Sequence, residues 1–458
     1  VLTTPAVGPA IMVEDRIQPT ALSIADGQVV FEYIGHGEGD GECCPSWNIR
    51  HTFAWQDGAL VEVSREEVSK VEAAAPGRSL VYGDAWEPVA CDTFGVGPEV
   101  AAVADCGYVT VPESRTSGSD RLIKLAVVRV RATGEETGAP LVLGTGGPGG
   151  GGLDNVRGAG GAGFLATYAP ILEDRDFVLF SQRGTALAQP TLDCPAYNAL
   201  TFEASAQGMS LEARGQAMRD ALVACADAFK AEGVDLAAYN TDENADDVDA
   251  IRQTLGYDKI FYYGESYGTQ LGQFVLRRHP DILAGIMLDG IVPVTIAQSV
   301  LVSNIPQAFR TVFAACAADA ACNAAYPDIE AMLVESIDQL RENPVPYTLA
   351  LPGQEPIELK IDDVLAMNAL FINLYIPGGY AVLPELIKQL HDGSLAPMVA
   401  TLPYVFADSD NARVMHYAIN CTDDPTTSFD GLGLAELPAA YADFVSSDSQ
   451  NYLNICQA

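Results

Sequence analysis

The chain has 458 residues, of which 48% are hydrophobic and 19% are charged. This composition excludes disorder as the dominant state and predicts a large core divided between two or three units. Asp and Glu number 61 against 25 Lys and Arg, giving a formal net charge of -36. A surface this acidic repels phosphate backbones and anionic lipid heads, so no nucleic acid partner is expected. We interpret the acidity as a solvating, extracellular type of surface.

The N-terminal part of the chain reads as a small β-rich module over residues 1–80. Strands are expected over 21–24, 28–33, 51–55 and 59–63, with turn signals between them. The polar stretch 64–78 is expected to separate this module from the rest of the chain. The acidic run 37–42 lacks the ordered ligand spacing of a calcium loop, so a solvated turn is expected there.

From about Trp86 the pattern changes to strands that alternate with helices. Strands are expected over 122–130, 141–143, 176–180, 259–263 and 286–288, with a helix over 245–255. Apolar runs joined by helices indicate an α/β fold with a mostly parallel sheet covered on both faces. Between 291 and 418 helical periodicity dominates, over 306–316, 329–341, 362–374 and 383–391. The predicted organisation is a core over 81–290, a helical cap over 291–418 and a return to the core over 419–458.

One apolar run is long enough to be considered as a membrane-spanning helix. Residues 282–302 are about long enough to span a bilayer. Asp289, Gly290 and Pro293 interrupt the run, which suits a buried parallel strand entering a loop. No membrane span is therefore expected. The chain begins at Val1, so we expect any export signal to have been removed or left out.

Ten cysteines with almost no Cys-x-x-Cys pattern indicate disulfides rather than a metal site. The spacing favours pairs that are local in sequence. The expected bridges are Cys91–Cys106, Cys194–Cys225, Cys316–Cys322 and Cys421–Cys456, with Cys43 and Cys44 left unassigned. Such bridges predict an oxidising, exported location.

Residues 262–269 carry the most specific chemical signal. They read Tyr-Tyr-Gly-Glu-Ser-Tyr-Gly-Thr, a Gly-x-Ser-x-Gly nucleophile elbow centred on Ser266 and preceded by a predicted strand. Small residues around the serine allow the strained turn from strand to helix that such an elbow needs. A serine hydrolase is therefore the first hypothesis.

A glycine-rich loop, 144–152, follows the predicted strand at 141–143. Its backbone N–H groups are unobstructed by side chains, which suits an oxyanion hole. A phosphate-binding loop is the competing interpretation, but Gly-Lys-Ser/Thr is missing and no basic residue follows before Arg157. A flexible linker would be the ordinary interpretation of such a loop standing alone. Its place between a strand and the elbow favours the oxyanion role.

Four motifs in order carry a family resemblance. Gly-Gly-Pro-Gly at 146–149, Gln-Arg-Gly-Thr at 182–185, the elbow, and Leu-Asp-Gly at 288–290 resemble the exported bacterial tripeptidyl aminopeptidase and proline iminopeptidase group of α/β-hydrolases. The resemblance implies an α/β-hydrolase core with a helical cap, a peptide substrate cleaved near its free amino end, and no metal or organic cofactor. One departure is Ser181, where the family usually has Asp. The N-terminal module lies outside the pattern.

The resemblance also assigns roles to residues of this chain. Ser266 would be the nucleophile, and the backbone N–H groups of Gly147 and Tyr267 would form the oxyanion hole. The supporting residues would be Gly146, Pro148, Gly149, Gln182, Arg183, Gly184 and Glu265.

Two other classes remain open. Serine carboxypeptidases share Gly-Gly-Pro-Gly and Gly-Glu-Ser-Tyr, but Thr145 stands here where they have Asn before the glycines, and Gln182-Arg183-Gly184 favours the aminopeptidase group. A further alternative is a non-catalytic surface or structural protein that retains a hydrolase body.

A triad also needs a base and an acid after the serine in chain order. Three histidines follow Ser266: His279 at the far end of the elbow helix, His391 at the end of a predicted cap helix, and His416. Asp408 or Asp410 would have to be the acid for His416, because Asp423 and Asp424 come after it. We expect the catalytic Asp and His on polypeptide beyond Ala458, in a longer chain, a cleaved fragment or a second polypeptide. The alternatives are that His416 serves as the base or that the protein is non-catalytic.

Overall fold

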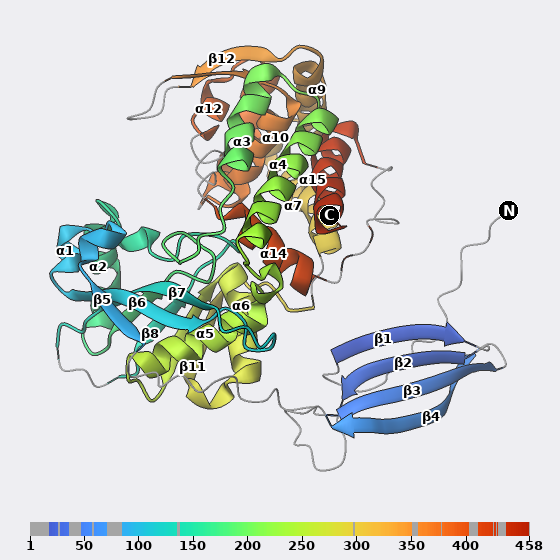
Figure 1. Ribbon diagram of the computed structural model, residues 1–458. Helices are drawn as coiled ribbons and strands as arrows, with labels where there is room; N and C mark the ends of the chain where they lie inside the picture. Colours follow the sequence, from blue (N-terminus) through green and yellow to red (C-terminus); the bar gives the residue numbers. More distant parts are fainter. Residues whose placement is uncertain are drawn as a thin grey trace. The chain divides into compact units, whose positions relative to one another are not determined.

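The computed structural model (Figure 1) describes residues 18–25, 28–35, 47–56, 59–70, 85–134, 138–295, 298–349, 356–376, 378–402, 411–424, 426, 428 and 437–457. The chain divides into two compact units, 1–79 and 80–458. The predicted pairs Cys91–Cys106, Cys194–Cys225, Cys316–Cys322 and Cys421–Cys456 are all confirmed as disulfides. Cys43, Cys44 and the acidic run 37–42 lie outside the described residues.

The first unit holds an antiparallel sheet of β1 (Gln18–Ala25), β2 (Gln28–Gly35), β3 (Trp47–Gln56) and β4 (Ala59–Lys70), in that order. Tyr33, Ile49 and Phe53 are buried in it. The prediction of a separator from residue 64 is wrong as far as Lys70, because β4 continues to pair with β3 along that stretch. Cross-strand pairing with β3 stabilises this stretch as a strand, although its polar composition is typical of a linker.

The second unit is built on a seven-stranded mixed sheet in the order β11-β10-β8-β9-β7-β6-β5. The strands are β5 (Trp86–Val89), β6 (Ala104–Pro112), β7 (Leu122–Val130), β8 (Leu141–Gly144), β9 (Phe177–Phe180), β10 (Ile260–Glu265) and β11 (Leu283–Asp289). The neighbours β9, β8, β10 and β11 pair in parallel, and β7, β6 and β5 continue the sheet in antiparallel pairs. The strand expected within 282–302 is β11.

Helices cover both faces of this sheet, as the apolar strands predict. Leu141 and Leu143 of β8 pack toward α2 (Gly160–Leu172), and Val142 between them packs toward α5 (Thr241–Thr254) and α6 (Tyr267–Arg278). Because successive strand residues point to opposite faces, a continuous apolar run is what a doubly covered strand needs. Short helical pieces complete the connections: α1 (Pro98–Ala101), η2 (Cys91–Phe94), η3 (Asp154–Val156), η4 (Leu236–Ala238) and η5 (Pro280–Ile282).

Helices that follow β11 form most of a second body with its own apolar core, drawn mainly in yellow, orange and red in Figure 1. From the region predicted as a cap come α7 (Gln298–Ala318), α8 (Ala320–Ala325), α9 (Ile329–Glu342), α10 (Asp363–Phe371), η6 (Ile372–Leu374), α11 (Gly379–His391) and α12 (Ala396–Val399). A hairpin of β12 (Val345–Leu349) and β13 (Ile357–Ile361) also belongs to it, which the helical periodicity did not predict.

Three helices pack across the ranges expected for the core and the cap. Helices α3 (Pro195–Gln207) and α4 (Leu211–Ala231) fall within the range predicted as core, yet α3 packs on β13 and α4 packs on α15 (Ala439–Gln457). Helix α15 falls within the predicted return to the core, but it packs on α7, α9 and α10. The physical reason is that an apolar helix face joins whichever core is nearest in space, irrespective of sequence order.

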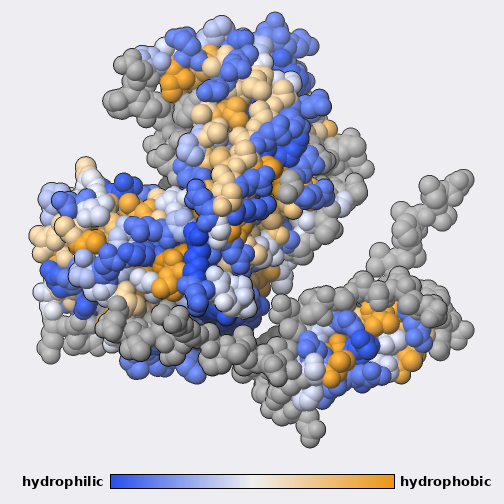
Figure 2. All heavy atoms as spheres, viewed as in Figure 1, coloured by the Kyte–Doolittle hydropathy of each residue, from blue (hydrophilic) through white to orange (hydrophobic). Residues whose placement is uncertain are grey.

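Figure 2 shows hydrophilic residues spread over the visible face, in keeping with the acidic composition. Within the described ranges, no helix has both the length and the hydropathy needed to cross a bilayer.

Candidate active site

Ser266 occupies the turn between β10 and α6 in a strained backbone conformation, with φ 53° and ψ -121°. Its N–H donates to the carbonyl of Asp289 at the end of β11 (3.0 Å), and its side chain is exposed. The turn is tight because a Cβ at Gly264 would overlap the carbonyl of Gly268, and one at Gly268 would overlap the carbonyl of Gly144. A positive φ on a serine persists only where its surroundings enforce it, and such strain clusters at functional sites.

Neighbouring hydrogen bonds hold the elbow in this conformation. The Ser266 carbonyl accepts from the N–H and hydroxyl of Thr269, at 2.8 and 2.6 Å. The Tyr262 hydroxyl donates to the Gly268 carbonyl (2.9 Å). Tyr267 is buried, its hydroxyl lies 2.8 Å from that of Thr241, and burial raises its pKa well above the ordinary value. Tyr267 is the first residue of α6, so its backbone N–H lies directly after the serine in the chain.

The glycine-rich loop after β8 runs against the elbow. A Cβ built on Gly146 would lie 2.9 Å from the Cβ of Ser266 and 3.4 Å from its Oγ. Gly147 and Gly149 have φ of 120° and 104°, which an L side chain rarely adopts. Gly147 is exposed, whereas Pro148 and Gly149 are buried. The structure thus brings the loop predicted to supply oxyanion donors into contact with the predicted nucleophile.

The segment 182–185 supports that loop from inside the protein. The Gln182 Nε2 donates to the carbonyl of Thr145 (2.9 Å). Arg183 is fully buried and forms a two-bond ion pair with Asp247, at 2.8 and 2.8 Å. Its Nη1 also donates to the carbonyls of Glu113 and Ala238. Arg183 therefore ties β6, α5 and η4 together and lies in the framework of the site rather than at its surface.

The structure also describes two other positions from the sequence analysis, Ser181 and Glu265. The hydroxyl of Ser181, where the resembled family has Asp, donates to the Ala186 carbonyl (2.6 Å) and so anchors the same loop. Glu265 is half-buried next to Ser266. Burial, the hydrogen bond to Asp289 and the charge of Glu265 all raise the pKa of Tyr263.

Two of the three histidines that follow Ser266, His279 and His391, are engaged away from the elbow. His279 lies at the opposite end of α6, and its Nε2 is 2.7 Å from a carboxylate oxygen of Asp246. His391 ends α11, where its Nε2 is 3.1 Å from Glu335. The proposed acids for His416, Asp408 and Asp410, lie outside the described residues.

His416 lies closer to the site than its neighbours in sequence suggest. It belongs to α14 (Arg413–Asp423), and its Nδ1 is 2.8 Å from the carbonyl oxygen of Pro148 in the glycine-rich loop. Its Nε2 is 2.9 Å from the side-chain Nδ2 of Asn420. Sequence reasoning did not predict this contact, although the i, i+4 spacing of His416 and Asn420 on one helix could have signalled a shared face.

Asp423, near the end of the same helix, accepts a hydrogen bond from the backbone N–H of Thr241 (3.0 Å), the first residue of α5. Burial raises the pKa of this carboxyl to about 6, and the nearby charge of Asp242 acts in the same direction. The hydrogen bonds from Thr241 and the charge of Arg277 oppose that rise. Helix α14 therefore contacts the site loop at one end and the core helix α5 at the other.

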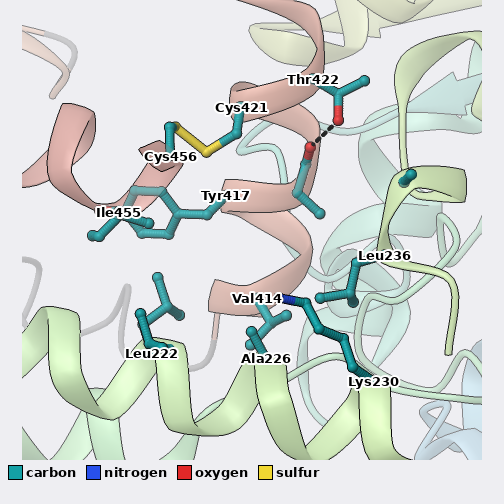
Figure 3. A pocket seen from close by; sticks show the side chains of 13 residues that line it. Leu222, Ala226, Lys230, Leu236, Val414, Tyr417, Cys421, Thr422, Ile455 and Cys456 are labelled. Carbon is teal, nitrogen blue, oxygen red and sulfur yellow. Dashed lines mark hydrogen bonds between the residues drawn. A yellow bond between two sulfur atoms is a disulfide. The ribbon is translucent and has the colours of Figure 1, made fainter. Parts of the chain in front are cut away.

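A cavity of about 220 Å³ lies behind α14, between that helix, α4 and α15 (Figure 3). Its walls are mostly apolar, and Lys230 of α4 extends toward Val414. The disulfide between Cys421 and Cys456 forms part of the wall. Neither Ser266 nor the glycine-rich loop lines it. Among the described residues, no group of three or more His, Cys, Asp or Glu is arranged to hold a metal ion.

Comparisons with known proteins agree with this geometry. Residues 139–325 match the family model described as the alpha/beta hydrolase fold. The serine protease Hip1 of Mycobacterium tuberculosis is 28% identical over 363 residues, covering 74% of this chain and 66% of that protein. Tripeptidyl aminopeptidase of Streptomyces lividans is 33% identical over 227 residues, covering 48% of this chain and 40% of that enzyme.

The chain thus spans less than two thirds of the length of these curated relatives. Among solved structures, a proline iminopeptidase-related protein from Thermus thermophilus matches with a TM-score of 0.26 and 19% identity, over 45% of this chain and 50% of that one. The sheet order, the elbow and the family match together show an α/β-hydrolase fold, and the chain is similar in sequence to proteins named serine protease and tripeptidyl aminopeptidase.

Proposed function

We propose that the natural protein is an exported bacterial serine peptidase that removes short peptides from free N-termini, with Ser266 as the nucleophile. The observation that carries this proposal is the exposed Ser266 at φ 53°, with Gly146 of the glycine-rich loop packed against it. The relatives named serine protease and tripeptidyl aminopeptidase support a peptide as the substrate.

The proposed reaction is acyl transfer. Ser266 Oγ attacks the peptide carbonyl carbon as its proton passes to a histidine base, and the N–H groups of Gly147 and Tyr267 stabilise the tetrahedral oxyanion. Collapse expels the amine of the leaving peptide, which takes a proton from the base. Water then attacks the acyl-enzyme and frees Ser266. The chemistry calls for no metal or organic cofactor.

We place the base and its acid on polypeptide outside these 458 residues. Both ring nitrogens of His416 already have partners, and His279 and His391 pair with carboxylates away from the elbow. In the described sheet β11 is an edge strand, and its Asp289 bonds Ser266. Because parallel strands end at one edge of a sheet, a strand added beside β11 in parallel would end close to Ser266. Such an addition is how the missing groups would reach the serine.

Fluorophosphonate labelling of the natural protein tests the nucleophile. An activated serine reacts with the probe, so wild type should label and Ser266→Ala should not. Replacing the exposed Ser119 with alanine is the matched control and should leave labelling unchanged. Equal labelling of Ser266→Ala and wild type would refute the assignment, and a wild type that never labels would favour the non-catalytic alternative.

A second comparison tests the base. The 458-residue chain alone should label at least a hundredfold more slowly than the natural protein, since a serine without its base loses most of its reactivity. Full-rate labelling of the 458-residue chain, abolished by His416→Ala and by His416→Asn alike, would instead make His416 the base.

Peptide specificity is tested with one peptide in three forms: free, N-acetylated and C-amidated. An enzyme that acts at free N-termini should cleave the free and C-amidated forms and reject the N-acetylated one. The reverse preference would assign the chain to the carboxypeptidase class. Export rests on the four disulfides, which form in oxidising compartments, and fractionation of the source cells should find the protein outside the cytoplasm.

A further inference from the structure

Helix α14 holds two consecutive carbonyl groups of the glycine-rich loop. The Pro148 carbonyl accepts from His416 Nδ1 (2.8 Å), and the Gly149 carbonyl accepts from the backbone N–H of Ala412 (3.1 Å). The approach is close, because a Cβ on Gly149 would lie 2.9 Å from Oδ1 of Asn411 and 3.4 Å from the Cβ of His416. The peptide planes on either side of Gly149 are therefore fixed by one helix.

The two hydrogen bonds of His416 indicate which ring nitrogen donates and which accepts. A carbonyl oxygen can only accept a hydrogen bond, so Nδ1 carries the proton toward Pro148. Nε2 then accepts from the Asn420 side-chain N–H. Asn420 is itself buried, and its backbone carbonyl accepts a hydrogen bond from the Tyr452 hydroxyl (3.0 Å). Donation by Nδ1 and acceptance by Nε2 satisfy both contacts, and donation by Nδ1 is what a loop-holding role requires.

Helix α14 is a firm support for such a role because it is anchored on other sides. The N–H groups of Val414 and Met415 donate to the carbonyl of Leu192, and the Cys421–Cys456 disulfide links α14 to α15. Asp423 binds the start of α5. The face with Val414 and Cys421 lines the cavity in Figure 3, while His416 and Asn420, one turn apart, share the face toward the loop.

We propose that His416 is a positioning residue for the oxyanion hole: it holds the carbonyl of Pro148, the residue after Gly147, and so limits the backbone movement that would turn the Gly147 N–H away from the developing oxyanion. The catalytic part of this inference rests on the proposed function, whereas the contact with the loop stands independently of it. Gly147 and Gly149 leave the loop backbone conformationally free. Contacts from outside the loop therefore have to fix its geometry. A misplaced oxyanion donor weakens transition-state stabilisation without changing the chemistry of the nucleophile.

The test compares His416→Ala with His416→Asn, whose side-chain N–H lies near the place of imidazole Nδ1. His391→Ala, on the distant helix α11, is the control. Hydrogen–deuterium exchange of the 458-residue chain is read over residues 144–156. His416→Ala should speed exchange in this peptide roughly tenfold, the equivalent of one lost hydrogen bond, and His416→Asn and His391→Ala should stay near wild type. Unchanged exchange in His416→Ala would overturn the proposal whether or not the protein is a peptidase.

Kinetics of the natural protein then test the catalytic part. His416→Ala should lower kcat roughly tenfold with little change in KM, and His416→Asn should recover most of it. If both variants lose activity equally while exchange in the loop is unchanged, His416 is the base and the positioning role is wrong. If the loop loosens in His416→Ala and wild type has no hydrolase activity, the proposed function fails while the structural role stands. Circular dichroism confirms that each variant is folded.

Discussion

The elbow at Ser266 and the Arg183 network lie in one unit, yet they are built in opposite ways. Around Ser266 the backbone is strained, the serine is exposed and the adjoining loop is rich in glycine. Around Arg183 the side chains are buried and every charge is paired, with Asp247 bonding both Arg183 and Arg115. The contrast teaches that a strained position is held by rigidity located elsewhere, since strain persists only where its surroundings over-determine it.

The largest expected effect on stability comes from removing the Arg183 side chain from its buried network. Arg183→Ala leaves Asp247 and two carbonyls short of their partner in a buried site, so the free energy of unfolding should fall by about 3–5 kcal/mol. Denaturant titration measures it. Lys230→Ala, which removes an exposed ion pair with Asp227, is the control and should cost under about 1 kcal/mol. Similar losses in both variants would contradict the supporting role.

A substitution in the glycine-rich loop beside Ser266 should change the labelling rate rather than the stability. Gly146→Ala places a methyl group 2.9 Å from the Cβ of Ser266, so the labelling rate of the natural protein should fall by roughly 10- to 100-fold. Gly163→Ala in α2, where a Cβ meets nothing within 4 Å, is the matched control and should stabilise by about 0.5–1 kcal/mol. Full reactivity of Gly146→Ala would show that the loop does not lie against the serine.

Asp423 offers a pH-dependent test of the link between α14 and the core. Its folded pKa of about 6 lies above the unfolded value of about 3.9. The folded protein therefore binds more protons between these values, and stability falls as pH rises from 4 to 6. Asp423→Asn keeps an acceptor for Thr241 and should remove this fall, gaining about 1–2 kcal/mol above pH 6 and nothing below pH 4.

Unfolding curves at several pH values measure the difference. Asp227→Asn, on the exposed side of α4, should change stability little at any of them. A constant difference between Asp423→Asn and wild type from pH 4 to 7 would show that the buried carboxyl does not titrate as expected.

The smallest expected effect concerns Ser181. Removing its hydroxyl in Ser181→Ala leaves the Ala186 carbonyl without that donor in a buried loop. The free energy of unfolding should fall by about 1 kcal/mol. A loss of activity much larger than this loss of stability would mean that the loop at 182–185 acts on the site more directly than Arg183 suggests.

Much of the architecture could be predicted from local sequence. Strand β7 begins and ends at the predicted residues, and β8 to β11 lie within a few residues of the predicted positions, because doubly covered strands demand continuous apolar runs. The β12–β13 hairpin lies between the helices predicted over 329–341 and 362–374 and was missed because each strand is only five residues long, a weak signal within a mainly helical region. The packing of α3 on β13 and of α4 on α15 could not be predicted, since an amphipathic helix does not specify its partner.

The sequence by itself determined the elbow and the glycine-rich loop, because tight turns depend on residues close together in the chain, and the spacing of its cysteines favoured the four disulfide pairs that the structure contains. It also placed Ser266 next to Tyr267 at the start of a helix. Only the tertiary structure decided that His416, 268 positions beyond Pro148, bonds the loop beside the serine. It likewise decided that Arg183 is an internal support. Contacts between distant segments depend on how whole helices pack, and a side chain's partner there is set by that packing rather than by its neighbours in sequence.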